Sequence, residues 1–335
     1  VLFRSAEVRR AVGPISAASH AHPSADLAVL GVTGTNGKTT VTHLLEAIAA
    51  AAGRRVGVIG TLGARVGGDA VPVGFTTPEA PDLQALLATM RDRGVDTVAM
   101  EVSSHALALH RVDGTRFVAT CYTNLTHDHL DFHGSMDAYL EAKARLFTPE
   151  FTARAAVNAD DPHGPALAER ARRDGLEVTT FGFGAEADVS ARAVEPGPDG
   201  TRLTLVLRGG EEHDAHLALL GRLNVANALA AAATLAVAAL HLAGAHGGAV
   251  LQRGIADAGF VESVHHDGAM AQAGHHFAHH RFAGDHRALR QRLAQRFLGG
   301  RGAGVVAQQV DEHGGVDGDH SAGSSARSEE HTSEL

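Results

Sequence analysis

The sequence predicts an α/β fold, a mostly parallel sheet flanked by helices, with a small antiparallel β subregion near residues 188–220. Strand-like apolar runs alternate with helix-periodic segments between residues 27 and 240, as in parallel sheets. Hydrophobic residues make up 44% of the chain and charged residues 20%, which is typical of a globular protein. A length of 335 residues suits about two domains.

The first predicted unit is a strand, a loop and a helix. Residues 27–32 are a short apolar run, a loop of Gly, Thr and Asn follows, and residues 39–52 carry apolar side chains at helical spacing. Residues 56–60 predict the next strand. Residues 66–73, with two adjacent glycines, predict a hairpin.

The middle of the chain continues the alternation. Residues 81–93 predict a helix because their leucines and Met90 share one face, and residues 95–102 and 117–123 predict buried strands. A helix is expected over residues 136–147. Further strands are expected at Val157 and over residues 178–181, followed by antiparallel strands over 188–194, 201–207 and 216–220 and an Ala-rich helix over 224–240.

The amino-acid composition changes after residue 240, where 12 of the 23 histidines lie. Only residues 285–297 predict a helix there. The two ends, residues 1–5 and 327–335, resemble translations of sequencing adapters and are excluded from the fold prediction. We expect residues 244–335 to be frame-shifted or disordered.

Composition excludes several functional classes. The net charge of −9 gives no support for a nucleic-acid-binding surface, and the most apolar stretches are too short or too Ala-rich for a membrane span. A single cysteine, Cys121, excludes a disulfide framework and suits a reducing cytoplasm.

Lysine is nearly absent from this chain. Lys38 and Lys143 are the only two among 29 basic residues, the others being arginine. We therefore expect each lysine to do something that arginine cannot, such as losing its proton and acting as an amine nucleophile.

A glycine-rich loop between the first strand and the first helix predicts a phosphate site. Backbone N–H groups of such a loop approach phosphate oxygens, and the helix N-terminus adds positive charge. Lys38 would reach the β- and γ-phosphates, and the Thr39 hydroxyl would bind Mg²⁺. Val32 stands where the general pattern has glycine, and a plain Gly-rich turn is the alternative. The predicted nucleotide-binding residues are Gly34, Thr35, Asn36, Gly37, Lys38, Thr39 and Thr40.

The segment GVTGTNGKTT resembles the phosphate loop of the Mur ligases and folylpolyglutamate synthases, which form amide bonds at the expense of ATP. Further motifs occur in the order of the MurE branch and cover roughly residues 6–240. They are Thr76-Thr77-Pro78-Glu79, EVSSHAL from Glu101, His110-Arg111, NLTHDHLDFHG from Asn124, AKARLF from Ala142 and Asn158-Ala159-Asp160-Asp161. The resemblance implies a P-loop-type sheet.

A metal site is expected at the end of the strand over residues 95–102. The Glu101 carboxylate is a hard ligand that suits Mg²⁺. The resemblance implies two Mg²⁺ ions, with His129 and a Lys143 carbamylated by CO₂ helping to hold the second. The expected catalytic residues are thus Lys38, Glu101, His129 and Lys143, and the metal ligands are Thr39, Glu101, His129 and Lys143. A zinc site of His127, His129 and His133 stays an alternative, as does a solvated surface role for Lys143.

The resemblance also implies substrate contacts. Thr76, Thr77, Ser103 and Arg111 would contact the muramoyl-dipeptide, and Asn224 and Asn227 would lie near the adenine. Leu109 replaces a glutamine that some relatives carry. From the residues alone, Arg111 could equally be a surface charge, and the two asparagines could be helix caps.

The resemblance implies an ATP-dependent ligase of peptidoglycan precursor synthesis. It would add a diamino acid to UDP-N-acetylmuramoyl-L-alanyl-D-glutamate through an acyl phosphate. We expect a monomeric cytoplasmic protein with residues 1–24 as the remnant of a uridine-nucleotide-binding domain and residues 25–243 as the central ATP-binding domain. No C-terminal ligase domain is recognisable in residues 244–335. The alternatives are a folylpolyglutamate synthase-like ligase, an inert ATP-binding fragment and a His-rich metal-binding tail.

Overall fold

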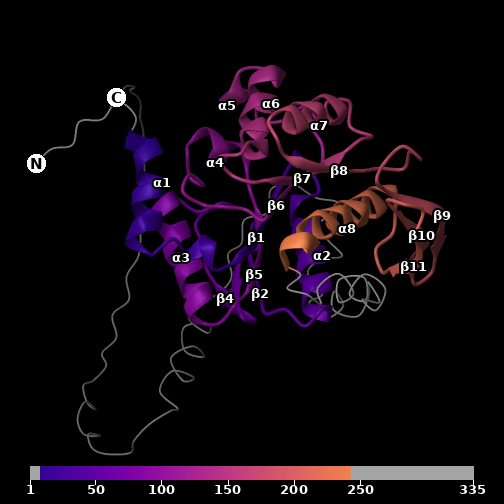
Figure 1. Cartoon of the computed structure of the whole chain (residues 1–335), viewed down its shortest axis with the longest axis horizontal. Coiled ribbons are helices and arrows are strands. Elements are labelled where there is room, and N and C mark those ends of the chain that lie inside the picture. The colour runs from indigo at the N-terminus through magenta and orange to yellow at the C-terminus, as the bar shows by residue number, and fades with distance from the viewer. Residues whose placement is uncertain (1–7, 243–335) are drawn as a thin grey trace, which may run out of the picture. The chain divides into compact units, whose positions relative to one another are not determined.

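The computed structural model describes residues 8–242, which build an eleven-stranded sheet covered by helices on both faces (Figure 1). The strand order is β11-β10-β9-β8-β7-β6-β1-β5-β2-β3-β4. The strands are β1 (Ala28–Thr33), β2 (Val56–Gly60), β3 (Gly63–Val66), β4 (Asp69–Val71), β5 (Thr97–Glu101), β6 (Ala119–Tyr122), β7 (Arg154–Asn158), β8 (Glu177–Phe181), β9 (Val189–Gly197), β10 (Gly200–Leu207) and β11 (Glu212–Leu217). The helices are α1 (Val8–Ser19), η1 (Pro23–Ala25), α2 (Lys38–Ala51), α3 (Ala80–Asp92), α4 (Ser104–Ala108), α5 (Leu130–His133), α6 (Met136–Ala144), η2 (Arg145–Phe147), α7 (Gly164–Arg173) and α8 (Arg222–Leu242).

Strand β1 lies at the centre of the sheet, parallel to both of its neighbours. It pairs with β5 on one side, where Val32 is opposite Glu101, and with β6 on the other, where Val32 is opposite Cys121. All six of its residues are buried, as expected for a strand covered on both faces. Because parallel strands end at one edge, the residues that follow β1, β5 and β6 meet there.

Successive side chains along the strands point to opposite faces of the sheet and contribute to two hydrophobic cores. Leu30 and Val32 pack with α2 and α8 on one face, whereas Val29 packs with helices such as α3 and α7 on the other. Figure 1 shows α8 alongside α2, and the two helices are in contact. The alanines of α8 let it lie close to β6–β9, and its Leu229 and Leu235 are fully buried.

The predicted fold class is confirmed, including the antiparallel subregion, where β10 pairs antiparallel with β9 and β11. Several details differ, among them helices α1, α4 and α5, which were not expected. Strand β9 also pairs parallel with β8 through one residue pair, and β11 ends at Leu217 and so lies earlier than expected. Helix α7 was not expected, although Leu167, Ala168 and Ala171 form its buried face. The helix expected over residues 285–297 lies outside the described residues.

Between residues 8 and 242, none of the helices combines the length and the apolar character that crossing a bilayer requires.

The packing of α8 predicts a stability contrast between two leucines of one helix. Leu229 is fully buried and Leu223 is 82% exposed. Leu229→Ala should lower the free energy of unfolding by about 2–5 kcal/mol, because it removes a buried side chain and leaves a cavity. Leu223→Ala, the matched control, should lie within about 0.5 kcal/mol of wild type. Urea unfolding followed by circular dichroism measures both; equal losses would contradict this packing.

Candidate functional site

The glycine-rich loop follows β1, and two of its glycines are required by close neighbours. Gly34 has φ +150, and a Cβ there would lie 1.9 Å from Thr123 Oγ1. Gly37 has φ +89 and precedes α2, and a Cβ there would lie 2.4 Å from Asn227 Oδ1. The loop therefore fits only with glycine at both positions.

A segment after β6 fixes the conformation of the loop. Thr35 N donates to the Asn124 carbonyl oxygen (2.9 Å), and Asn36 N donates to Asn124 Oδ1 (2.9 Å). Thr123 Oγ1 donates to the Asn36 carbonyl oxygen (2.6 Å), and Thr126 N donates to Thr35 Oγ1 (3.0 Å). The backbone groups of the loop are thus held from one side. Sequence reasoning missed these residues, although Asn124 opens one of the quoted motifs.

The supporting segment is itself held by the Asn158–Asp161 motif. Asn158 Nδ2 donates to the Thr123 carbonyl oxygen (2.7 Å). The buried Asp161 accepts hydrogen bonds from Leu125 N (2.9 Å) and Tyr122 Oη (2.8 Å). A buried carboxylate with several donors is a strong anchor, because leaving any of those groups unpaired would be costly.

Lys38 lies over its own loop at the start of α2. Its Nζ donates to the carbonyl oxygens of Gly34 (3.0 Å) and Thr35 (2.9 Å). Burial lowers the pKa of Lys38, and the nearby carboxylates of Glu101 and Asp128 oppose that shift. The ammonium group therefore lies against the loop, and a phosphate oxygen bound there could accept from it.

Glu101 and Thr39 form a pair of oxygen ligands at the end of β5. Thr39 Oγ1 donates to Glu101 Oε1 (2.9 Å), and the Glu101 side chain is 1% exposed. Thr61 N also donates to Oε1 (2.8 Å), and Thr61 Oγ1 donates to Oε2 (3.1 Å). A carboxylate and a hydroxyl this close are a donor set that Mg²⁺ accepts. Thr61 was not among the predicted residues.

Lys143 is buried on α6, where no hydrogen bond to its Nζ is found within residues 8–242. Its Nζ lies 4.3 Å from the centroid of the Tyr139 ring, and the side chain is 1% exposed. Burial, with the positive charge of Lys38, lowers the pKa of Lys143 to about 6, against an opposing effect of Asp128. This lowered pKa favours the neutral amine at pH 7. Tyr139 Oη lies 3.2 Å from Thr35 Oγ1 and links this region to the phosphate loop.

His129 lies beside the same region, in a cluster of aromatic rings. Its ring centroid is 4.8 Å from that of His105 and 6.2 Å from that of Tyr139, and its Nε2 is 3.4 Å from Asp128 Oδ2. His133 pairs with Ser104 Oγ (3.0 Å). Over the described part of the chain, no three His, Cys, Asp or Glu side chains form a group that could hold a metal ion. The zinc alternative thus finds no ligand set there.

The four predicted substrate residues are neighbours at the same edge of the sheet. Thr77 Oγ1 donates to the Glu101 carbonyl oxygen (2.9 Å) and accepts from Ser103 N (3.1 Å). Arg111 Nη1 donates to the Thr77 carbonyl oxygen (3.3 Å). Thr76 Oγ1 lies 3.2 Å from Thr61 Oγ1.

Arg111 is not a freely solvated surface charge. Its Nη2 lies 2.8 Å from Glu79 Oε1, and its Cζ lies 4.4 Å from the centroid of the Phe75 ring. The buried Nε has no hydrogen-bond partner in the described residues. A buried donor without a partner is costly, and an acceptor that reached Arg111 Nε would relieve that cost.

The two predicted asparagines lie at the start of α8. Asn227 Oδ1 faces Gly37, so this helix touches the phosphate loop. Asn224 Nδ2 donates to the Leu220 carbonyl oxygen (2.9 Å), and Asn227 Nδ2 donates to Asn224 Oδ1 (3.4 Å). This Asn224 contact is donation to a carbonyl oxygen before the helix, whereas a cap would accept from an N–H of the first turn, so it does not support the capping alternative.

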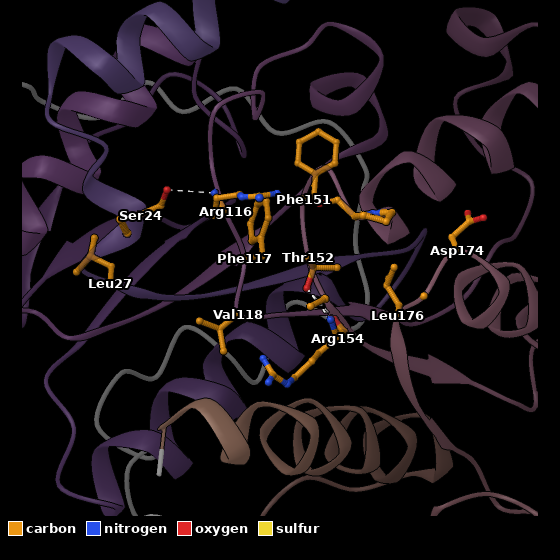
Figure 2. Close-up of a pocket in the computed structure, with 14 residues that line it drawn as sticks. Ser24, Leu27, Arg116, Phe117, Val118, Phe151, Thr152, Arg154, Asp174 and Leu176 are labelled. Carbon is orange, nitrogen blue, oxygen red and sulfur yellow. Dashed lines mark hydrogen bonds between the residues drawn. The ribbon is translucent and has the colours of Figure 1, made fainter. Parts of the chain in front are cut away.

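A cavity of about 490 Å³ lies at the opposite edge of the sheet, where β1, β6 and β7 begin (Figure 2). Arg116 crosses it, but its Nη1 donates to the carbonyl oxygens of Pro149 (2.8 Å) and Glu150 (2.6 Å), and its backbone N donates to Ser24 Oγ (3.1 Å). Since these contacts engage the Arg116 side chain within the fold, and since ligands of open α/β sheets bind at the carboxyl edge, the phosphate-loop edge is the candidate site.

The comparisons with known proteins identify a family and several relatives. A family model described as the Mur ligase middle domain matches residues 32–235. The chain is 45% identical over 234 residues to the UDP-N-acetylmuramoyl-L-alanyl-D-glutamate–2,6-diaminopimelate ligase of Streptomyces avermitilis, covering 69% of this chain and 46% of the relative. It is 46% identical over 234 residues to the ligase of the same name from Geobacter metallireducens, covering 68% and 45%. The chain spans about half the length of the curated relatives it matches.

Solved structures show the same architecture. The structure of a UDP-N-acetylmuramoyl-L-alanyl-D-glutamate–2,6-diaminopimelate ligase superposes with a TM-score of 0.64 at 29% identity, covering 74% of this chain and 50% of the other. A folylpolyglutamate synthase of Mycobacterium tuberculosis complexed with ADP superposes with a TM-score of 0.60 at 19% identity, covering 76% and 63%. The second likeness concerns the fold alone.

The buried state of Lys143 predicts a pH-dependent stability difference. Between about pH 6 and 10.5 the unfolded chain holds a proton on this amine that the folded chain lacks, so wild-type stability rises with pH across that window. Lys143→Met should therefore be more stable than wild type near pH 6, and its advantage should shrink as the pH approaches 10. Thermal unfolding in CO₂-free buffers measures this. The 80% exposed Arg208, changed to Met as control, should give a constant difference; a constant difference for Lys143→Met would contradict the burial of a neutral amine.

The hydrogen bonds of Asn124 predict a local change in backbone protection. Asn124→Ala removes the Oδ1 acceptor of the Asn36 amide but keeps the carbonyl acceptor of the Thr35 amide. The Asn36 amide should exchange on the order of tenfold faster in deuterium exchange read by NMR. The Thr35 amide is the internal control. Equal acceleration of both amides would mean that the whole segment moves instead.

Proposed function

The chain belongs to the Mur ligase family, and from that premise we propose that it forms the ATP-binding part of a ligase of peptidoglycan precursor synthesis. The acceptor would be UDP-N-acetylmuramoyl-L-alanyl-D-glutamate, and the added group a diamino acid. The observation that carries the proposal is the buried neutral amine of Lys143, which lies at the phosphate-loop edge of the sheet and interacts with the charge of Lys38. A lysine of this kind is suited to chemistry that an arginine could not perform.

ATP would bind with its phosphates in the loop of residues 34–40. Backbone N–H groups and the N-terminus of α2 attract the phosphate charge, and Lys38 exchanges its two carbonyl acceptors for phosphate oxygens. The contact between Gly37 and Asn227 supports an adenine site beside the start of α8, where Asn224 also lies.

The proposal includes two Mg²⁺ ions. Thr39 and Glu101 would hold one ion, and His129 and the carbamate of Lys143 would help to hold the other. The paired oxygen atoms of Thr39 and Glu101, 2.9 Å apart, support the first site. When bound, such ions neutralise charge on the transferring phosphoryl group.

Carbamylation of Lys143 needs only the neutral amine and CO₂. The lone pair of Nζ attacks the carbon, one C–O double bond becomes a single bond, and Nζ loses one proton to water. The product is an anionic carbamate in place of a neutral amine. The lowered pKa of the Lys143 amine supports this step, because the unprotonated amine that attacks CO₂ is then present at pH 7.

Thr76, Thr77, Ser103 and Arg111 would orient the muramoyl-dipeptide beside the phosphates. The unpaired Nε of Arg111 supports a role in holding an anionic group of this substrate. The D-glutamyl γ-carboxylate would attack the γ-phosphorus and release ADP. The amine of the diamino acid would then attack the acyl carbon, lose a proton, and expel phosphate.

We also retain the domain boundaries, compartment and assembly drawn from the sequence as proposals. Residues 1–24 would end a uridine-nucleotide-binding domain, residues 25–243 would form the ATP-binding domain, and residues 244–335 stay unassigned. Residues 1–7 of the first segment and the whole of the third segment lie outside the described residues. The protein would act as a cytoplasmic monomer.

Nucleotide binding and turnover test the proposal on the 335-residue chain. Lys38→Met should weaken ATP binding in Mg²⁺ by about tenfold or more in calorimetry, because a charged donor to phosphate is lost. Lys38→Arg should show only part of that loss, because it keeps a positive charge. Arg208→Met, the control at an 80% exposed position, should bind ATP as tightly as wild type. ADP release should require both the UDP-muramoyl-dipeptide and a diamino acid.

The outcomes separate the alternatives. Turnover with a folate and glutamate instead would identify a folylpolyglutamate synthase-like ligase. ATP binding without any turnover would restrict this chain to nucleotide binding, and absence of ATP binding would refute the proposal.

A further inference from the structure

The buried carboxylate of Glu101 is held mainly by one residue that lies 40 positions away. Thr61 N donates to Oε1 at 2.8 Å, and Thr61 Oγ1 donates to Oε2 at 3.1 Å. Thr39 supplies the remaining hydrogen bond, to Oε1. Because the backbone and the side chain of Thr61 engage different oxygens, they fix both the position and the plane of the carboxylate.

The local backbone places Thr61 in this position with little freedom. Gly60 pairs with Gly63 across the β2–β3 hairpin, so Thr61 and Leu62 form a two-residue turn between paired strands. A Cβ on Gly60 would lie 2.3 Å from Glu101 Oε1. The glycine before Thr61 is therefore what lets the carboxylate approach the turn closely.

A second contact connects Thr61 to the predicted substrate side of the site. Its Oγ1 lies 3.2 Å from Thr76 Oγ1. A carboxylate oxygen only accepts, so the single hydroxyl proton of Thr61 points to Glu101, and Thr76 must donate to Thr61. The hydrogen bonds thus run in one direction, from Thr76 through Thr61 to Glu101.

We infer that Thr61 is a positioning residue that orients Glu101 for a divalent cation and links that carboxylate to Thr76 in the substrate site. The inference rests on the proposed function, which gives Glu101 its metal. A ligand that takes the Thr76 hydroxyl removes a donor from Thr61 and so alters the group that orients the carboxylate. Cation affinity and occupancy of the substrate site are then coupled, and by linkage the coupling is reciprocal.

Binding of Mn²⁺ to the 335-residue chain in the presence of ADP, followed by electron paramagnetic resonance, tests the orienting role. Thr61→Val keeps the shape and the backbone donor but removes the hydroxyl, and should raise the Mn²⁺ dissociation constant on the order of tenfold. Thr61→Ser, which keeps the hydroxyl, should stay within about twofold of wild type. Thr89→Val is the matched control, because the exposed Thr89 hydroxyl donates to the Ala85 carbonyl oxygen within its own helix, away from Glu101.

The coupling is read from the same titration with the UDP-muramoyl-dipeptide added. The added dipeptide should shift the Mn²⁺ dissociation constant of wild type and of Thr61→Ser. It should leave the Mn²⁺ dissociation constant of Thr61→Val unchanged. Equal Mn²⁺ affinity of Thr61→Val and Thr61→Ser would overturn the inference while leaving the proposed function standing. If the wild type bound neither ADP nor Mn²⁺, the proposed function itself would fail, and this inference with it.

Thermal melts guard against a folding defect. If Thr61→Val melts far below wild type, Thr61→Ala replaces it, since it also keeps the backbone donor and loses the hydroxyl. The expected rise in the dissociation constant is the same, and an unchanged constant in folded Thr61→Ala overturns the inference.

Discussion

The hydrogen bonds between the phosphate loop and the segment after β6 are the constraint on which the rest of the site depends. A loop that must present N–H groups to a ligand cannot satisfy all of its own backbone within itself. Here Asn124 and Thr123 hold the carbonyl and amide groups of Asn36 from behind. The loop is therefore preorganised without a ligand, and the ends of β1 and β6 are joined at one edge.

Sheet order explains why residues far apart in sequence meet at this edge. Strands β5 and β6 flank β1, so Glu101 at the end of β5 and the segment after β6 both face the loop that follows β1. Helix α6 follows that segment and carries Tyr139 against Thr35. The contribution of the core is to hold three parallel strands in one register, because a shift of one residue would turn Glu101 away.

The sequence predicted the parts of the site whose chemistry is visible in a single residue and its local context. Lys38 and Thr39 follow a strand and open a helix, and Glu101 ends a buried strand. Thr61 and Asn124 escaped prediction because their roles depend on partners that only the folded sheet brings near. Their side chains are ordinary turn and loop residues in sequence. The same reason applies to the parallel contact of β9 with β8, since pairing partners are not encoded in a strand's own pattern.

Lys38 and Lys143 interact electrostatically, and carbamylation of Lys143 would reverse the sign of that interaction. Burial and the positive charge of Lys38 both disfavour the protonated form of the Lys143 amine. On the proposed function, carbamylation replaces that unfavourable cation with an anion. The interaction with Lys38 then becomes attractive, and the anion gains cations as partners. Burial is the larger cause of the lowered pKa of Lys143, and the repulsion by Lys38 adds to it. The interaction with Lys38 that helps to keep the amine neutral is thus the one that would stabilise its modified form, and an arginine at position 143 could take part in neither.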